Sequence, residues 1–346
     1  MSNPIEKRGA IIPLGWPEMT ARGSERIWDY LRKLGIIKNV NLLVGHAGMI
    51  VVQHDQLEYF DFGRYITPKT MGRARSSRTD PKLRLKTIPE WDNYGKLLNL
   101  VGILQELENN SEATHGEGPI YATVYYDADV EKVLEYAYSI QDLGFLGYNG
   151  LDRKCTNCAR FVTRGILAGL TRNSMEYLRF RYPLSYAPTP YSNVLTASKG
   201  NYCVFHQGQA NFQRRPRQHA LTHILGNLTH AFRRSKATKL PSDRKAGQLY
   251  PPKPRPKSVP KKAIYIGGIG EGAWHDLESV NAEIIKMTRY NASGEFEFSD
   301  NYELREPWVS KFNSGQCELV HDTHFAWLTL ESKSSGERIR CFRIIL

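Results

Sequence analysis

The sequence predicts an α+β protein in which a larger mixed domain is followed by a small, mostly β domain. Strand-like and helix-like segments alternate up to residue 234, whereas strand-like runs dominate after residue 262. Between them, KLPSDRKAGQLYPPKPRPKSVPKK is dominated by proline, lysine and arginine and cannot form a regular core. We therefore expect a larger domain, of the size of an enzyme's catalytic domain, at 1–234, a basic linker at 235–262 and a β-rich domain at 263–346.

The elements of the larger domain follow from the spacing of their apolar residues. Strands are expected at 41–52, 57–62 and 120–126, and helices at 23–35, 88–108, 129–144 and from about 157 onward. A polar loop, GYNGLDRKCT, precedes the last of these helices. The C-terminal part contributes three tryptophans, Trp274, Trp308 and Trp327, which would fill a small core or bind a polymer.

The charge of the chain is +12 and is concentrated in two segments. Residues 199–262 hold fifteen lysines and arginines against one acid, and residues 64–86 hold eight against one. Such segments favour anionic partners such as nucleic acid, acidic lipid headgroups or wall polymers. A solvated linker is the alternative interpretation of the same composition.

Composition also limits the compartment and the class of protein. The N-terminal segment has no apolar run long enough for a signal peptide, and no stretch reaches the ~18 apolar residues of a membrane span. Five cysteines without a pairing pattern argue against a disulfide framework. We expect synthesis in the cytoplasm without a signal peptide, and export, if any, by a specialised secretion system.

Cys158 stands at the start of an apolar-striped helix. At that position the unpaired N–H groups and the dipole of the first turn stabilise a thiolate, and the same groups can accept an oxyanion. A thiol nucleophile also needs a base, which is usually a histidine on a neighbouring element. His46, which interrupts the apolar strand LLVGHAGMIVV, is the best candidate. A structural role for a single strand histidine is the alternative.

The motif Asn157-Cys158-x-x-Phe161-Val162, with a strand histidine far upstream, resembles the circularly permuted papain-like superfamily. This superfamily includes lecithin:retinol acyltransferase with its phospholipase relatives, and the NlpC-type cell-wall peptidases. The resemblance spans about 41–170. It implies an antiparallel sheet packed on the nucleophile-bearing helix, with Cys158 as nucleophile, His46 as general base and a third polar residue that orients His46.

The sequence departs from the lipid-acting relatives at two places. Those relatives often carry a histidine two positions after the cysteine, where this chain has Arg160, and a second histidine on the next strand, where it has Glu58 and Asp61. Strand alternation selects between these acids: a two-residue turn puts Asp61 on the face of His46, and a three-residue turn with a bulge puts Glu58 there. Two-residue turns are commoner, so we predict Asp61.

Other motifs are weaker. Cys155-x-x-Cys158 lacks the preceding buried strand of a redox motif, and the remaining cysteines do not form a zinc pattern. The run GGIGEG at 267–272 does not match a nucleotide loop and fits turn chemistry. His219-x-x-x-His223 lacks the glutamate of an H-E-x-x-H site, and we expect these histidines to face solvent or phosphate. No cofactor and no metal are expected.

The predicted function is a cysteine-dependent acyl hydrolase or acyltransferase that works through a thioester. Phospholipid-like esters and peptidoglycan amides are the two substrate classes, and a bacterial effector would suit either. The expected partners are a lipid or cell-wall substrate, an anionic membrane surface, and an immunity or chaperone protein. The rival hypothesis is a non-enzymatic basic protein that binds nucleic acid or anionic membrane, although the chain has no nucleic-acid-binding motif.

Overall fold

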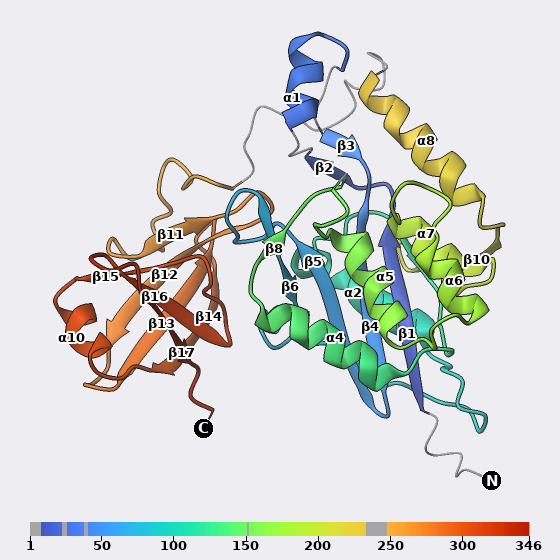
Figure 1. Cartoon of the computed structure of the whole chain (residues 1–346). Coiled ribbons are helices and arrows are strands. Elements are labelled where there is room, and N and C mark those ends of the chain that lie inside the picture. Colours follow the sequence, from blue (N-terminus) through green and yellow to red (C-terminus); the bar gives the residue numbers. More distant parts are fainter. Residues whose placement is uncertain (1–7, 23–25, 38–40, 151, 233–247, 346) are drawn as a thin grey trace.

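The computed structural model describes residues 8–22, 26–37, 41–150, 152–232 and 248–345 (Figure 1). Its larger part is built on an eight-stranded antiparallel sheet with the order β10-β9-β7-β1-β4-β5-β6-β8. The strands are β1 (Gly9–Trp16), β4 (His46–Gln53), β5 (Gln56–Gly63), β6 (Met71–Arg75), β7 (Ile120–Ala122), β8 (Leu146–Gly147), β9 (Asn201–His206) and β10 (Gln209–Arg214). Two short strands, β2 (Thr20–Arg22) and β3 (Asn41–Leu43), pair separately.

Each face of the large sheet carries its own apolar core. On one face, Met49, Phe60 and Phe62 pack against α5 (Cys158–Ala168) and α4 (Val130–Asp142). On the other face, Ile50 and Tyr59 pack with α2 (Leu100–Asn109). The remaining helices are α1 (Arg26–Lys33), η2 (Pro81–Leu83), α3 (Ser111–Thr114), α6 (Met175–Arg181), α7 (Pro190–Ala197) and α8 (His219–Phe232). Burial of alternate strand residues on both faces fixes the register of the central strands.

The small C-terminal part is mostly β, as the sequence predicts. A four-stranded sheet, β11 (Ile264–Gly267), β12 (Gly272–Ser279), β13 (Ile284–Asn291) and β14 (Phe296–Glu303), packs with a three-stranded sheet, β15 (Cys317–Leu319), β16 (Trp327–Ser332) and β17 (Arg338–Phe342), and with α10 (Trp308–Asn313). Trp274, Trp308 and Trp327 are all buried. They therefore serve as core residues in this structure.

Two differences from the sequence expectations concern the larger part. The helix expected at 88–108 begins only at Leu100, and the preceding residues form turns and an isolated bridge between Trp91 and Leu97. No strand was expected at 9–16, where the structure has the central strand β1. Proline has no N–H to donate to a neighbouring strand. It is tolerated at position 13 because β7 pairs only with Leu14 and Gly15 of β1.

The basic segment 64–86 is only partly an exposed cationic surface, since Lys69, Lys82, Arg84 and Lys86 are exposed and some other basic side chains are not. Arg64, Arg73 and Arg75 are buried, and Arg73 forms two hydrogen bonds of 2.7 Å with Asp80. Arg78 pairs with Asp142 at 2.8 Å. Arg73, Arg75 and Arg78 therefore neutralise acids of the fold, and they contribute less to an anion-attracting field than the composition suggests.

The expected linker falls partly outside the described residues. Of residues 235–262, the structure describes 248–262, which contain turns and no helix or strand. No helix among the described residues is both long enough and apolar enough to pass through a membrane.

Candidate active site

Cys158 is the first residue of α5. Asn157 caps the helix, and its side-chain oxygen accepts a hydrogen bond from the N–H of Arg160 at 2.9 Å. The thiol therefore lies at the positive end of the helix dipole, beside the remaining N–H groups of the first turn. Cys158 is 7% exposed, so the thiol is largely shielded from water.

His46 is the first residue of β4 and contacts both other predicted site residues. Its Nε2 lies 3.3 Å from Oδ2 of Asp61, and its ring lies close enough to the thiol of Cys158 for each group to shift the pKa of the other. The ring of Trp16 stacks on it at a centroid distance of 5.7 Å. The structure thus brings Cys158, His46 and Asp61 into one continuous chain of contacts. Because Nε2 faces Asp61, Nδ1 is the nitrogen left for the thiol.

The electrostatics of this chain favour an ion pair. Burial lowers the pKa of His46, but hydrogen bonds with Asp61 and Cys158 outweigh burial and raise the pKa to about 9. Burial raises the pKa of the Cys158 thiol, but the hydrogen bond and charge of His46 and the N–H groups of Ala47 and Ala159 leave it below its usual value. Both shifts favour a thiolate beside an imidazolium.

Asp61 reaches His46 because β4 and β5 are joined by a two-residue turn, His54-Asp55. Gln53 pairs with Gln56, so Gly48 lies opposite Asp61 and the side chain of Asp61 shares the face of His46. The carboxylate is fully buried. Burial alone would raise the pKa of Asp61, but the charge of Arg75 and the hydrogen bond with His46 hold it well below its usual range.

Glu58 lies elsewhere and serves a different purpose. Its carboxylate accepts hydrogen bonds from the backbone N–H and the hydroxyl of Ser77 at 3.0 and 2.9 Å. Burial raises the pKa of Glu58, and the Ser77 hydrogen bonds only partly offset it. This acid therefore holds the loop after β6 and does not approach His46.

Three residues that the sequence did not reveal surround Asp61. The hydroxyls of Tyr65 and Tyr59 donate to Oδ2 at 2.6 and 3.2 Å, and Arg75 donates from Nε and Nη2 at 3.0 and 2.6 Å. Arg75 also lies 3.4 Å from the centroid of the Tyr65 ring. A signal for Arg75 existed, because β6 places it directly opposite Asp61, but MGRAR has to be recognised as a strand first.

Arg160 takes no part in the chain of contacts around the thiol. Its guanidinium instead donates to backbone carbonyls of the preceding loop, those of Asn149 at 3.0 Å, Gly150 at 2.9 Å and Asp152 at 2.6 Å. The side chain thereby fixes the loop that leads into Cys158. The arginine at this position therefore binds the loop, whereas the lipid-acting relatives often have a histidine there.

The other motifs have structural partners. The Cys155 thiol donates to Asp152 at 3.7 Å, and every cysteine in the chain is free of disulfides. His219 and His223 pack edge-on against the ring of Tyr191, so the expectation that they face solvent is wrong. In the described part of the chain, no three or more His, Cys, Asp or Glu side chains gather as a metal site would require.

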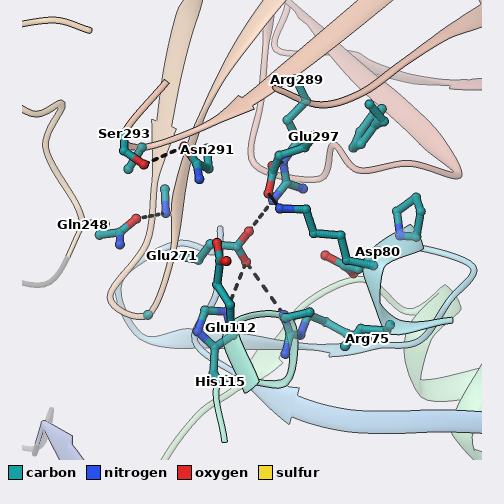
Figure 2. Close-up of a pocket in the computed structure, with 18 of the residues that line it drawn as sticks. Arg75, Asp80, Glu112, His115, Gln248, Glu271, Arg289, Asn291, Ser293 and Glu297 are labelled. Carbon is teal, nitrogen blue, oxygen red and sulfur yellow. Dashed lines mark hydrogen bonds and ion pairs between the residues drawn. The ribbon is translucent and has the colours of Figure 1, made fainter. Parts of the chain in front are cut away.

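A cavity of about 320 Å³ lies between the large sheet and the C-terminal part (Figure 2). Its walls are mostly charged or polar, and Arg75 and Glu271 both line it. Arg75 therefore binds Asp61 within the sheet on one side and borders the cavity on the other.

Two family models and one solved structure are similar to parts of this chain. Residues 11–175 match the family model described as type VI secretion system effector TseH-like, and residues 263–342 match a model described as DUF6695 C-terminal domain. A solved structure, that of the type VI secretion system effector TseH, is 16% identical with a TM-score of 0.42, and covers 60% of this chain and 99% of its own. No curated protein matches.

Proposed function

We propose that this protein is a cysteine-dependent acyl hydrolase or acyltransferase with a permuted papain-like catalytic domain, delivered as a bacterial effector. The contact chain Cys158–His46–Asp61 carries the proposal, because it unites a thiol at a helix N-terminus, a base and an acid that orients the base. The match of residues 11–175 to an effector family supports delivery by a secretion system.

In the first proposed step, the Cys158 thiolate attacks a carbonyl carbon, forming a C–S bond. The first N–H groups of α5, those of Cys158 and Ala159, donate hydrogen bonds to the oxyanion that develops, because the N–H of Arg160 already donates to Asn157. His46 then gives its proton to the leaving oxygen or nitrogen as the old acyl bond breaks. The product of this step is a thioester.

In the second step, water or another acceptor attacks the thioester. His46, now neutral, takes the proton of the acceptor, and the Cys158 thiolate leaves. Asp61 stays ionised throughout, because Arg75 and two tyrosine hydroxyls hold its charge, and it stabilises the imidazolium whenever that form returns.

Peptidoglycan amides are the better supported of the two substrate classes. The lipid-acting relatives place a histidine two positions after the nucleophile, and here Arg160 occupies that position and is bonded to the loop. Phospholipid-like esters remain the second candidate.

The test is a substrate comparison with a nucleophile control. Purified protein is incubated with bacterial sacculi and, separately, with vesicles of phosphatidylethanolamine and phosphatidylglycerol, and products are identified by mass spectrometry. We expect muropeptide cleavage that is lost in Cys158→Ala and His46→Ala. Lysophospholipid and fatty acid instead of muropeptides would shift the proposal to lipid esters. Turnover that survives Cys158→Ala would overturn the thiol mechanism.

A further inference from the structure

The glycine-rich loop 267–272 joins β11 to β12 and lies against the larger part of the chain. The N–H of Gly270 donates to the carbonyl oxygen of Arg64 at 2.6 Å. At Gly268 an added Cβ would fall 1.5 Å from the carbonyl oxygen of Tyr65, so only glycine fits there. The glycines therefore permit a close approach of two backbones.

The contact between the two parts is reciprocal and extends beyond this loop. Ile66 of the larger part is buried in the apolar core of the C-terminal part. The N–H of Phe325 donates to the carbonyl of Thr79 at 3.1 Å, and Arg340 donates to the carbonyl of Asp142 at 3.2 Å. The C-terminal part thus contacts the segment that follows β5, the loop after β6 and the end of α4.

This contact places a carboxylate, that of Glu271, beside Arg75 of the candidate site. Glu271 follows Gly270, and its Oε2 lies 4.0 Å from Nη1 of Arg75 and 3.9 Å from Nε2 of His115 (Figure 2). Its other oxygen pairs with Arg289. Burial and Arg75 lower the pKa of His115 to about 4, so that ring is neutral at pH 7 and Arg75 is the charged partner on the larger part.

Arg75 is consequently held between two acids. Its Nε and Nη2 bind Asp61, and its remaining nitrogen, Nη1, faces Glu271. The same loop backbone supports Tyr65, whose hydroxyl donates to Asp61 at 2.6 Å and stands 3.5 Å from Nε2 of His46. Loop 267–272 is therefore linked to the carboxylate of Asp61 in two ways, through Glu271 and Arg75 and through Tyr65.

We propose that Glu271 is a positioning residue for the His46–Asp61 pair and that the C-terminal part completes the catalytic centre through loop 267–272. This inference rests on the proposed function. The groups that face Glu271 are Arg75, Arg289 and His115, with Asp80 nearby. His46 is faced by Asp61, Cys158 and Tyr65, with Arg75 and His115 behind them.

The negative charge of Glu271 balances Arg75 and leaves Asp61 free to stabilise the imidazolium. Without that charge, the positive field of Arg75 is uncompensated at His46 and Cys158, which disfavours the form in which the Cys158 thiol and the His46 ring are both protonated. The acid limb of Cys158 reactivity, the pH range in which the thiol loses its proton, should then move to lower pH. Since Glu271 lines a cavity, its substitution by glutamine requires no repacking of an apolar core.

The experiment measures the rate at which iodoacetamide alkylates Cys158 in the full chain from pH 4 to 9, by peptide mass spectrometry. Glu271→Gln is expected to move the acid limb downward by about 0.5 pH unit, roughly a threefold gain of rate on the limb. Glu271→Asp, which keeps the charge, is expected to move it less. Gly268→Ala should move it at least as far as Glu271→Gln, because it displaces both Glu271 and Tyr65.

Glu297→Gln is the matched control, because Glu297 also pairs with Arg289 but not with Arg75. It should leave the limb in place. An unchanged limb in Glu271→Gln, or an equal shift in Glu297→Gln, would overturn the inference while His46→Ala still shifts the limb. If His46→Ala also leaves the limb unchanged, the proposed function and the inference fail together.

Discussion

Arg75 lies directly opposite Asp61 across the β5–β6 ladder, and its Nε and Nη2 donate to the two carboxylate oxygens at 3.0 and 2.6 Å. Two residues earlier on β6, Arg73 makes a second forked pair with Asp80, with both distances 2.7 Å. Both pairs are buried. The Arg75–Asp61 pair fixes the acid that contacts His46, whereas the Arg73–Asp80 pair joins β6 to the loop after it. Substitutions in the second pair can therefore serve as controls for substitutions in the first.

Arg75→Lys should impair the site more than the fold. Lysine keeps the positive charge but cannot donate in two directions to one carboxylate, so Asp61 loses its fixed orientation. We expect alkylation of Cys158 at pH 6 to slow by about tenfold, the effect of a shift of roughly one pKa unit. The rate is measured with iodoacetamide. Arg73→Lys is the control, and an equal slowing there would contradict a specific role for Arg75.

Asp80→Asn should destabilise the fold and flatten its acid dependence. Burial raises the pKa of Asp80, but the charge and hydrogen bonds of Arg73 lower it well below the ordinary value. The unfolded state therefore takes up a proton near pH 4 while the folded state does not. This contribution to stability is complete above that pH and is lost as pH falls toward the folded pKa.

The variant lacks that titration. We expect its unfolding free energy to be lower by about 3–5 kcal/mol at pH 7, because Arg73 is left buried without its partner. Below pH 4 its stability should fall less steeply than that of the parent, by about 1.4 kcal/mol per pH unit. Urea unfolding from pH 2.5 to 7 measures both. Parallel acid limbs in parent and variant would contradict the assignment.

Local sequence signals sufficed wherever a contact follows from strand alternation or a helix start. The start of α5 at Cys158 follows from Asn157 and the apolar stripe, and the face shared by His46 and Asp61 follows from turn length. In the same way, Asp129 caps α4 as the expected helix at 129–144 requires. These relationships lie within a few residues or one hairpin, where period and capping rules apply directly.

Relationships that depend on tertiary burial were not accessible. Arg73 and Arg75 looked like parts of a surface charge run because composition does not show which charges find acids inside the fold. Loop 267–272 looked like an ordinary turn because the residue it touches, Tyr65, is about 200 positions away in the sequence. Long-range partners of charged and glycine residues are the information that single-sequence periodicity lacks.

His46 should remain protonated well above neutral pH. Its pKa is raised to about 9, since Asp61 and Cys158 outweigh burial. Nuclear magnetic resonance of ¹⁵N-histidine-labelled protein should show its titration midpoint near this value, with His46→Ala identifying the signal. In Cys158→Ser the thiolate is gone, and the midpoint should fall by roughly one unit or more. A midpoint at or below 6.5 in the parent would contradict the ion pair.

Arg160→Lys should loosen the loop that leads into Cys158. The arginine reaches the carbonyls of Asn149, Gly150 and Asp152 from two nitrogens, whereas a lysine ammonium reaches from one point. Carbonyls left without donors should lower stability by about 1–3 kcal/mol. Amide hydrogen exchange over 149–157 should accelerate, while exchange in α4 stays unchanged.

Arg164→Lys provides the control from the same helix. Arg164 lies one turn further along α5 and makes only longer contacts with the same loop, 3.3 Å to the carbonyl of Arg153 and 3.5 Å to that of Cys155. Its substitution should change exchange in the loop much less than Arg160→Lys does. Equal acceleration in both variants would mean that the loop depends on positive charge near α5 rather than on the geometry of Arg160. Unchanged exchange in both would mean that the loop holds its shape through its own turns.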